Sequence, residues 1–385
     1  SGKFAYVANQ GSDNVSAYTI DATGALNAAG TTVPVPGTNP SSVTVDPSGR
    51  FAYVANNGSN NVSAYTINAA NGVLTAFDCD GNPRSPGDTC TAGINPASVT
   101  VDPSGKFAYV ANQGSDNVSA YSINATTGVL TALGSVAGRN GNLAMAMTKG
   151  TAAVTYTPKF AYVTNNLANS VSAYTINTAT GALGVVAGSP FAAGTNPSSV
   201  TVDPSGRFAY VANAGFNNVS AYTIDATSGA LTSAGTTTAV PGTRPQSVTV
   251  DPSGKFAYVA NYDSNDVSAY TISATTGVLT AFDCDDNPFT FGGTCAAGTS
   301  PYSVTVDPSG KFAYVANTNS NNVSAYTINT STGALTSVGM TVAVPGTGPS
   351  SVTVDPSGKF AYVANVFSNN VSAYTINATT GALSG

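Results

Sequence analysis

Short apolar runs recur along the chain, and clusters of Gly, Pro, Asp, Asn and Ser separate them. Residues 42–75 show the pattern with the runs SVTV, FAYVA and NVSAYTI, which are rich in β-branched and aromatic residues. Turn-forming residues at 46–49 and 57–60 lie between these runs, so we predict short β-strands joined by hairpin turns. The i, i+3, i+4 spacing of an amphipathic helix is not sustained anywhere, which argues against a helical solenoid.

Neither face of the predicted strands is consistently polar. In the second strand of the unit, Phe51 and Tyr53 point to one side while Ala52 and Val54 point to the other. A strand with two apolar faces belongs to a sheet that is covered on both sides, as in blades stacked around an axis.

The unit is repeated eight times. Each copy holds FAYVAN or FAYVTN, a variant of NVSAYTI and a brief stretch such as ALT, and most copies are preceded by SVTV. The eight copies start at Phe4, Phe51, Phe107, Phe160, Phe208, Phe256, Phe312 and Phe360. Four short strands in each repeat predict an all-β fold, a β-propeller that fills residues 1–385 as a single domain.

The number of blades follows from the strand count. Only seven copies of the SVTV strand are present, counting the divergent 143–147, so we expect eight four-stranded blades of which the first lacks its inner strand. Seven blades plus a fragment is the alternative. The spacing of the copies also indicates a duplicated four-blade block, roughly 1–204 and 205–385. The open edge of blade 1 is a template for pairing with another strand.

The recurring YVAN, which reads YVTN at 162–165, and the NVSAYTI that follows it resemble the YVTN-repeat β-propellers. That family occurs in bacterial and archaeal surface proteins and in lactonase-like seven-bladed proteins. The resemblance implies that the SVTV strand lies beside the central channel. It specifies fold more than chemistry, because propellers host unrelated functions.

Four cysteines occupy equivalent places in the two blocks. We predict the disulfides Cys79–Cys90 and Cys284–Cys295, because the other pairings would join insertions on opposite blades. Structural disulfides indicate an oxidising compartment, so we expect an exported protein at the cell surface or outside the cell.

The same insertions suggest a calcium site. Oxygen side chains at positions 1, 3 and 5 of a sharply turning loop are typical of calcium ligands, but the closing acidic residue is missing. We therefore favour an acidic solvated loop braced by the disulfide, with calcium binding as the alternative. The candidate ligands are Asp78, Asp80, Asn82, Asp283, Asp285 and Asn287.

The composition and net charge exclude several catalytic mechanisms and partners. Only 8% of the 385 residues are charged, the formal net charge is −6, and His and Glu are both absent. Without them the chain has no Ser-His or Cys-His pair and no imidazole zinc site. A net negative charge disfavours nucleic acid as a partner, and no apolar run is long enough to span a membrane.

Two surfaces stand out. One face carries Asp followed four residues later by Lys or Arg, as in Asp46 and Arg50, which we interpret as turn chemistry. The other face holds the turns that differ between copies and is expected to be acidic. Aromatic and aliphatic residues on these turns form a candidate binding rim, namely Leu167, Phe216, Tyr262 and Phe367. The alternative is that the long connections between blades cover them.

From the sequence we expect a non-catalytic structural or interaction propeller without a cofactor, apart from the calcium candidate. It would contact copies of itself, other surface proteins or a glycan, and could assemble into a layer or filament through blade 1. A lactonase-like hydrolase and a small-ligand or glycan-binding propeller are the alternatives.

Overall fold

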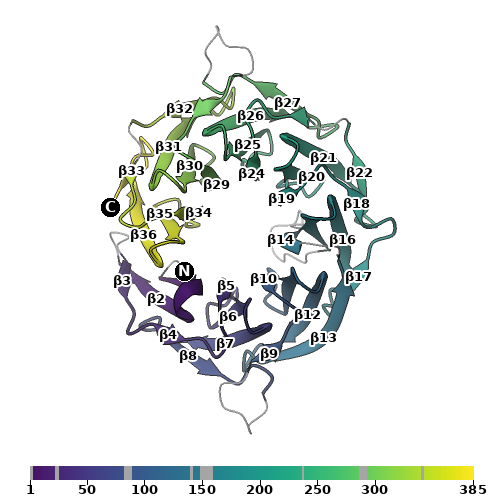
Figure 1. The fold of residues 1–385 in the computed structure, drawn as a ribbon, viewed down its shortest axis with the longest axis vertical. Coiled ribbons are helices and arrows are strands. Elements are labelled where there is room, and N and C mark those ends of the chain that lie inside the picture. Colours follow the sequence, from purple (N-terminus) through teal and green to yellow (C-terminus); the bar gives the residue numbers. More distant parts are fainter. Residues whose placement is uncertain are drawn as a thin grey trace.

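The computed structural model describes residues 3–21, 26–81, 89–138, 142–147, 159–235, 238–285, 293–339 and 342–385. These residues form eight antiparallel sheets arranged as a ring around one axis (Figure 1). The eight-bladed prediction is confirmed, and the alternative of seven blades plus a fragment is not observed. The described residues include one short 3-10 helix, η1 (Gln10–Ser12), and none of their helices is long and apolar enough to cross a membrane.

Each complete blade has an inner, a second, a third and an outer strand. The inner strands are β5 (Pro40–Val45), β10 (Pro96–Val101), β14 (Asn142–Met147), β19 (Pro197–Val202), β24 (Pro245–Val250), β29 (Pro301–Val306) and β34 (Pro349–Val354). The second strands are β1 (Phe4–Asn9), β6 (Phe51–Asn56), β11 (Phe107–Asn112), β15 (Phe160–Asn165), β20 (Phe208–Asn213), β25 (Phe256–Asn261), β30 (Phe312–Asn317) and β35 (Phe360–Asn365). Blades are numbered 1 to 8 in the order of these second strands.

The third strands carry the NVSAYTI motif. They are β2 (Asn14–Ile20), β7 (Asn61–Ile67), β12 (Asn117–Ile123), β16 (Ser170–Ile176), β21 (Asn218–Ile224), β26 (Asp266–Ile272), β31 (Asn322–Ile328) and β36 (Asn370–Ile376). The outer strands are β3 (Leu26–Ala28), β8 (Leu74–Phe77), β13 (Leu130–Ala137), β17 (Leu183–Val185), β22 (Leu231–Ser233), β27 (Leu279–Phe282), β32 (Leu335–Ser337) and β37 (Leu383–Ser384). Six short strands in the connections between blades also pair with third strands: β4 (Val33–Pro34), β9 (Cys90–Thr91), β18 (Phe191–Ala192), β23 (Thr238–Ala239), β28 (Cys295–Ala296) and β33 (Val342–Ala343).

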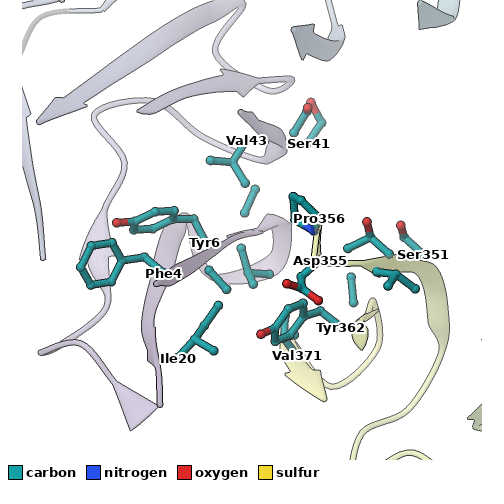
Figure 2. A pocket seen from close by; sticks show the side chains of 17 residues that line it. Phe4, Tyr6, Ile20, Ser41, Val43, Ser351, Asp355, Pro356, Tyr362 and Val371 are labelled. Atoms are coloured by element: carbon teal, nitrogen blue, oxygen red, sulfur yellow. The ribbon is translucent and has the colours of Figure 1, made fainter. Parts of the chain in front are cut away.

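Blade 1 lacks an inner strand, as predicted. Among the described strands β1 pairs only with β2, whereas every other second strand also pairs with an inner strand. Side chains from blades 1, 2 and 8 surround the resulting opening (Figure 2). Because no inner strand covers this side of blade 1, most of β1 is only partly buried, and β35 of blade 8 is less buried than the second strands of blades 2 to 7.

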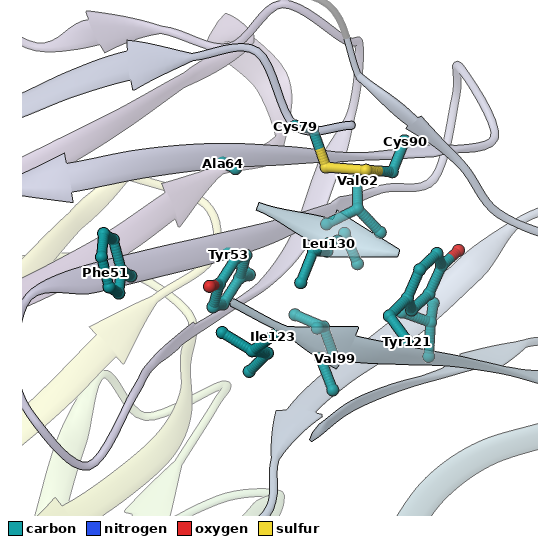
Figure 3. Packing of buried hydrophobic residues seen from close by; sticks show 13 residues of the cluster. Phe51, Tyr53, Val62, Ala64, Cys79, Cys90, Val99, Tyr121, Ile123 and Leu130 are labelled. Atoms are coloured by element: carbon teal, nitrogen blue, oxygen red, sulfur yellow. A yellow bond between two sulfur atoms is a disulfide. The ribbon is translucent and has the colours of Figure 1, made fainter. Parts of the chain in front are cut away.

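The core lies between neighbouring blades, where a large face meets a small one. Phe51 and Tyr53 of blade 2 pack with Ala108 and Val110 of blade 3 in one buried cluster (Figure 3). The Tyr53 hydroxyl donates a 2.7 Å hydrogen bond to the Gly128 carbonyl of blade 3. Gly128 has φ +79°, and a Cβ there would lie 2.4 Å from the Phe51 ring, so only glycine fits.

The Asp residues that precede Lys or Arg stabilise turns, which confirms the turn interpretation. Asp46 Oδ1 accepts hydrogen bonds from the backbone N–H groups of Arg50 at 2.9 Å and Phe51 at 2.8 Å. Its Oδ2 accepts one from Ser48 N–H at 3.0 Å. The carboxylate therefore organises the hairpin between the inner and second strands.

The two predicted disulfides are present. Cys79–Cys90 and Cys284–Cys295 each join Cα atoms 5.4 Å apart, and all four cysteines are buried. They belong to blades 2 and 6, which lie opposite each other in the ring (Figure 1). Each disulfide ties the end of an outer strand to the connection that leads to the next blade.

Candidate functional site

Two large cavities open beside the inner strands. One, of about 530 Å³, lies along β1 where the inner strand of blade 1 is missing, and apolar side chains such as Phe4, Ile20 and Val43 contribute to its lining. The other, of about 460 Å³, extends across blades 4 to 7 and contains Arg244 together with Tyr262 and Tyr302. A concave site with a cation, aromatic rings and amides is suited to a polar small molecule, so we treat the second as the candidate site.

Arg244 has an unusual backbone for its residue type. It lies in the connection before β24 with φ +56°, in the left-handed region that a long side chain adopts at a cost. The equivalent left-handed positions of the other described connections hold Asn39, Asn95, Asn196, Ser300 and Gly348. A strained residue that departs from the repeat in this way indicates a functional role for its side chain.

The Arg244 guanidinium is held between a carboxylate and a ring. Its Nη1 lies 3.4 Å from Asp263 Oδ1, and its Cζ lies 4.7 Å from the centre of the Tyr262 ring. Tyr262 in turn meets Tyr302 edge to face, with ring centres 6.2 Å apart. The charged side chains are half exposed, so water and a ligand can reach them, and the ion pair itself adds little stability.

Backbone hydrogen bonds fix the relative positions of these residues. Tyr262 N–H donates to the Arg244 carbonyl at 2.9 Å, and Asp263 N–H donates to the Thr243 carbonyl at 3.2 Å. Arg244 N–H donates to Asn217 Oδ1 at 2.8 Å, which ties the connection to blade 5. The carboxylate, the guanidinium and the ring are thus preorganised on one rigid corner.

Inner-strand side chains shape the rest of the cavity. Tyr302 is the second residue of β29 and Gln246 the second residue of β24, at a position where blades 2, 5 and 8 carry serine. Ser198, at this position in blade 5, donates a hydrogen bond to the Pro245 carbonyl of the next blade at 3.1 Å. Ser198 and the larger residues of blades 6 and 7, Gln246 and Tyr302, all line the cavity, and Tyr302 is 45% exposed.

This arrangement supplies two functions that ester hydrolysis requires. Asp263 is not a lining residue itself but adjoins the cavity through its contact with Arg244, and its half-exposed carboxylate can accept a proton from water. The Arg244 guanidinium can stabilise an oxygen that gains negative charge. The Tyr262 and Tyr302 rings offer apolar surface for a small ring-shaped ligand.

The predicted rim is only partly brought together. Tyr262 lines the cavity, whereas Leu167, Phe216 and Phe367 are each 69% exposed and are not among its lining residues. Sequence reasoning missed Arg244, Asp263 and Tyr302. Comparison of each repeat position across the copies would have found Arg244, because it replaces Asn, Ser or Gly.

The calcium candidates are not assembled into a site by the described residues. Asn82 and Asn287 lie outside the described residues, and Asp78, Asp80, Asp283 and Asp285 form no group of three metal-ligating acids within them. Calcium binding by these loops stays a prediction.

Comparison with known protein families finds a match over most of the chain. The family model described as "Lactonase, 7-bladed beta-propeller" matches residues 1–86, 74–147, 151–288 and 290–385. No curated protein matches the chain in sequence.

Solved structures share the fold. A Bacteroides uniformis protein provisionally described as a 6-phosphogluconolactonase has TM-score 0.61 and 18% identity, covering 99% of this chain and 94% of its own. The periplasmic gluconolactonase of Pseudomonas aeruginosa has TM-score 0.58 and 18% identity, covering 99% and 93%. Kuenenia stuttgartiensis hydrazine synthase has TM-score 0.61 and 21% identity, covering 91% and 99%. At these identities the likeness shows the fold alone.

Proposed function

The chain belongs to the lactonase family of β-propellers, and from this membership we propose that it hydrolyses lactones in the cavity around Arg244. The observation that carries the proposal within the chain is the pairing of the left-handed Arg244 with Asp263. It places a cation and a carboxylate together where the other described connections carry Asn, Ser or Gly.

The expectation of a non-catalytic structural propeller, and with it the expectation that the protein is not an enzyme, is wrong. The family match across the chain overturns both. The inference failed because the absence of His and Glu excludes only the mechanisms that use those side chains. A lactone is an ester, and its hydrolysis requires an activated water and a stabilised oxyanion, which Asp and Arg can supply.

The proposed reaction uses water as the nucleophile. Asp263 takes a proton from water while the water oxygen bonds to the lactone carbonyl carbon, and the carbonyl oxygen becomes an oxyanion beside Arg244. The ring C–O bond then breaks, and the proton on Asp263 passes to the departing ring oxygen. The product is an open hydroxy acid, and Asp263 returns to its starting state.

The substrate class follows from the charge of the cavity. Among the described residues that line it, Arg244 is the cation, and its charge is already offset by Asp263. A phosphate dianion would need further cationic partners to repay its desolvation. We therefore propose a neutral sugar lactone rather than a phosphorylated one, in line with the gluconolactonase among the structural neighbours.

Two further assignments belong to this proposal. The buried disulfides and the periplasmic neighbour support an exported protein. The YVAN and YVTN motifs support a place among the YVTN-repeat members of the propeller families.

Replacement of Asp263 by Asn tests the mechanism. We expect kcat for hydrolysis of glucono-δ-lactone to fall at least about 100-fold, because the amide cannot accept the proton from water. Asp225→Asn is the matched control, since Asp225 is an exposed carboxylate on a turn at the other face of the ring and should not affect kcat. Equal rates for wild type and Asp263→Asn would contradict the assignment of the base.

A further inference from the structure

The opening beside β1 has the form of a strand-binding slot. It comprises the cavity of about 530 Å³ and an adjoining one of about 280 Å³, lined in turn by Phe4 to Ala8 and by Val7 to Gln10. β5 of blade 2 and β34 of blade 8 form its two walls (Figure 2). An inner strand occupies the equivalent place in each of the other seven blades.

The floor of the slot offers unpaired backbone groups. In blade 2, Phe51 N–H and C=O bond to Asp46 on the inner-strand side, so alternate residues of the second strand face that side. The equivalent residues of β1 are Phe4, Tyr6 and Ala8, and among the described strands β1 has no partner on this side. Their N–H and C=O groups can receive one antiparallel strand.

The end of the slot beside the turn that follows β1 indicates which residues should precede the bound strand. In blade 2, the N–H groups of Asn57 and Gly58 donate to the carbonyls of Asn39 and Thr38 at 2.9 and 3.0 Å. In blade 1 the matching turn residues Gln10 and Gly11 have no such partner among the described residues, and the turn forms η1 instead.

Blade 8 contributes a matching acceptor. The left-handed Asn321 of blade 7 accepts a hydrogen bond on its Oδ1 from Gly348 N–H of the next connection at 2.8 Å. Asn369 is the equivalent left-handed residue of blade 8 and lines the slot. No backbone N–H of a following connection lies among the described residues to donate a hydrogen bond to its Oδ1. We therefore expect the bound strand to be preceded directly by a left-handed residue whose N–H donates to Asn369, as Asn39 precedes β5.

The walls specify a Ser-Val pair within the strand. Neighbouring inner strands are joined by bonds from a valine N–H to a serine Oγ, as from Val352 to Ser303 at 3.4 Å. Val99 N–H likewise donates to Ser42 Oγ at 3.3 Å. Ser351 and Val43 line the slot and are the equivalents of this serine and this valine, so Ser351 Oγ can accept such a bond and Val43 N–H can donate one. An occupant with serine followed by valine would satisfy both walls.

We propose that this slot binds one peptide strand from outside residues 1–385, of the class Gly-Thr-Asn-Pro-Ser-Ser-Val-Thr-Val-Asp-Pro and antiparallel to β1. This sequence occurs at residues 37–47 and 194–204, where it forms the connection and inner strand of blades 2 and 5. The described inner strands of a second copy of residues 1–385 are not the occupant, because each of them already pairs within its own blade.

The test uses this peptide with a fluorescent label and measures anisotropy. We expect saturable binding, a higher melting temperature on addition of the peptide, and no binding of the same peptide with both valines replaced by proline, which cannot donate to β1. Ser351→Ala should weaken binding about five- to tenfold through loss of one acceptor. Ser303→Ala, the same change in a filled wall, should leave the affinity unchanged.

A protein variant provides the blocking control. Residues 1–385 preceded by Pro-Ser-Ser-Val-Thr-Val-Asp-Pro carry the strand in place, so this variant should melt at a higher temperature and should not bind the free peptide. Absence of saturable binding to the wild-type chain up to about 1 mM peptide would overturn the proposal. So would binding that the fused strand does not block, or a dimer of the wild-type chain that excludes the peptide.

Discussion

Replacement of Arg244 by Asn is expected to lower kcat/KM for a neutral sugar lactone about 100-fold or more while the fold is retained or strengthened. The guanidinium is the cationic group among the described lining residues, and loss of an oxyanion donor typically has an effect of that size. Asn is the residue that three equivalent connections carry at the same left-handed position.

Stability should respond in the opposite direction to activity. Asn adopts the left-handed backbone more readily than Arg, by up to about 1 kcal/mol, whereas the half-exposed Arg244–Asp263 pair contributes little. The free energy of unfolding of Arg244→Asn, measured with urea, should therefore equal or exceed that of the wild type. Ser300→Asn at the equivalent position of blade 7 is the control and should leave kcat/KM unchanged. A large loss of stability in Arg244→Asn would show that Arg244 has a structural role instead.

Alkaline pH should unfold the ring steeply. Most of the 19 tyrosines lie in the blade interfaces, and burial raises their pKa, to about 12 for Tyr6, Tyr121 and Tyr326 and above that for Tyr53 and Tyr109. In the unfolded chain these hydroxyls lose their protons near pH 10. The stability contributed by the neutral tyrosines is therefore fully present below about pH 10 and is lost as the pH rises toward their folded pKa.

Each buried tyrosine makes stability fall by about 1.4 kcal/mol per pH unit in this range, and the contributions of many tyrosines add. We expect phenolate absorbance and the far-ultraviolet circular dichroism of the sheets to change together in one transition between about pH 10 and 12. Tyr53→Phe removes one titrating group and should make the transition less steep. Gradual phenolate formation with unchanged circular dichroism would contradict the buried, hydrogen-bonded state of these tyrosines.

The repeat made most of the fold predictable. Each FAYVAN copy alternates a large and a small apolar residue, so Phe51 and Tyr53 require a neighbouring blade that presents Ala108 and Val110. The missing inner strand could be predicted because seven copies carry it, and both disulfides because two copies have the same cysteine pair at equivalent places.

The candidate site was harder to predict because it depends on contacts between connections and turns. Arg244 and Asp263 are 19 residues apart and belong to segments that become neighbours only when two backbone hydrogen bonds join them. The function was misjudged for a related reason. The absence of His and Glu excludes the commonest catalytic groups, whereas the candidate site consists of one arginine in a strained conformation beside one aspartate.

The central claim is that this eight-bladed member of the lactonase family opens neutral sugar lactones. The most direct test is a pH-stat measurement of acid release from glucono-δ-lactone by the purified 385-residue chain, corrected for spontaneous hydrolysis and compared with the 6-phosphorylated lactone. We predict saturable acid release that is proportional to protein concentration and has a higher kcat/KM for the unphosphorylated lactone. Acid release no faster than the spontaneous rate with either compound would contradict the claim.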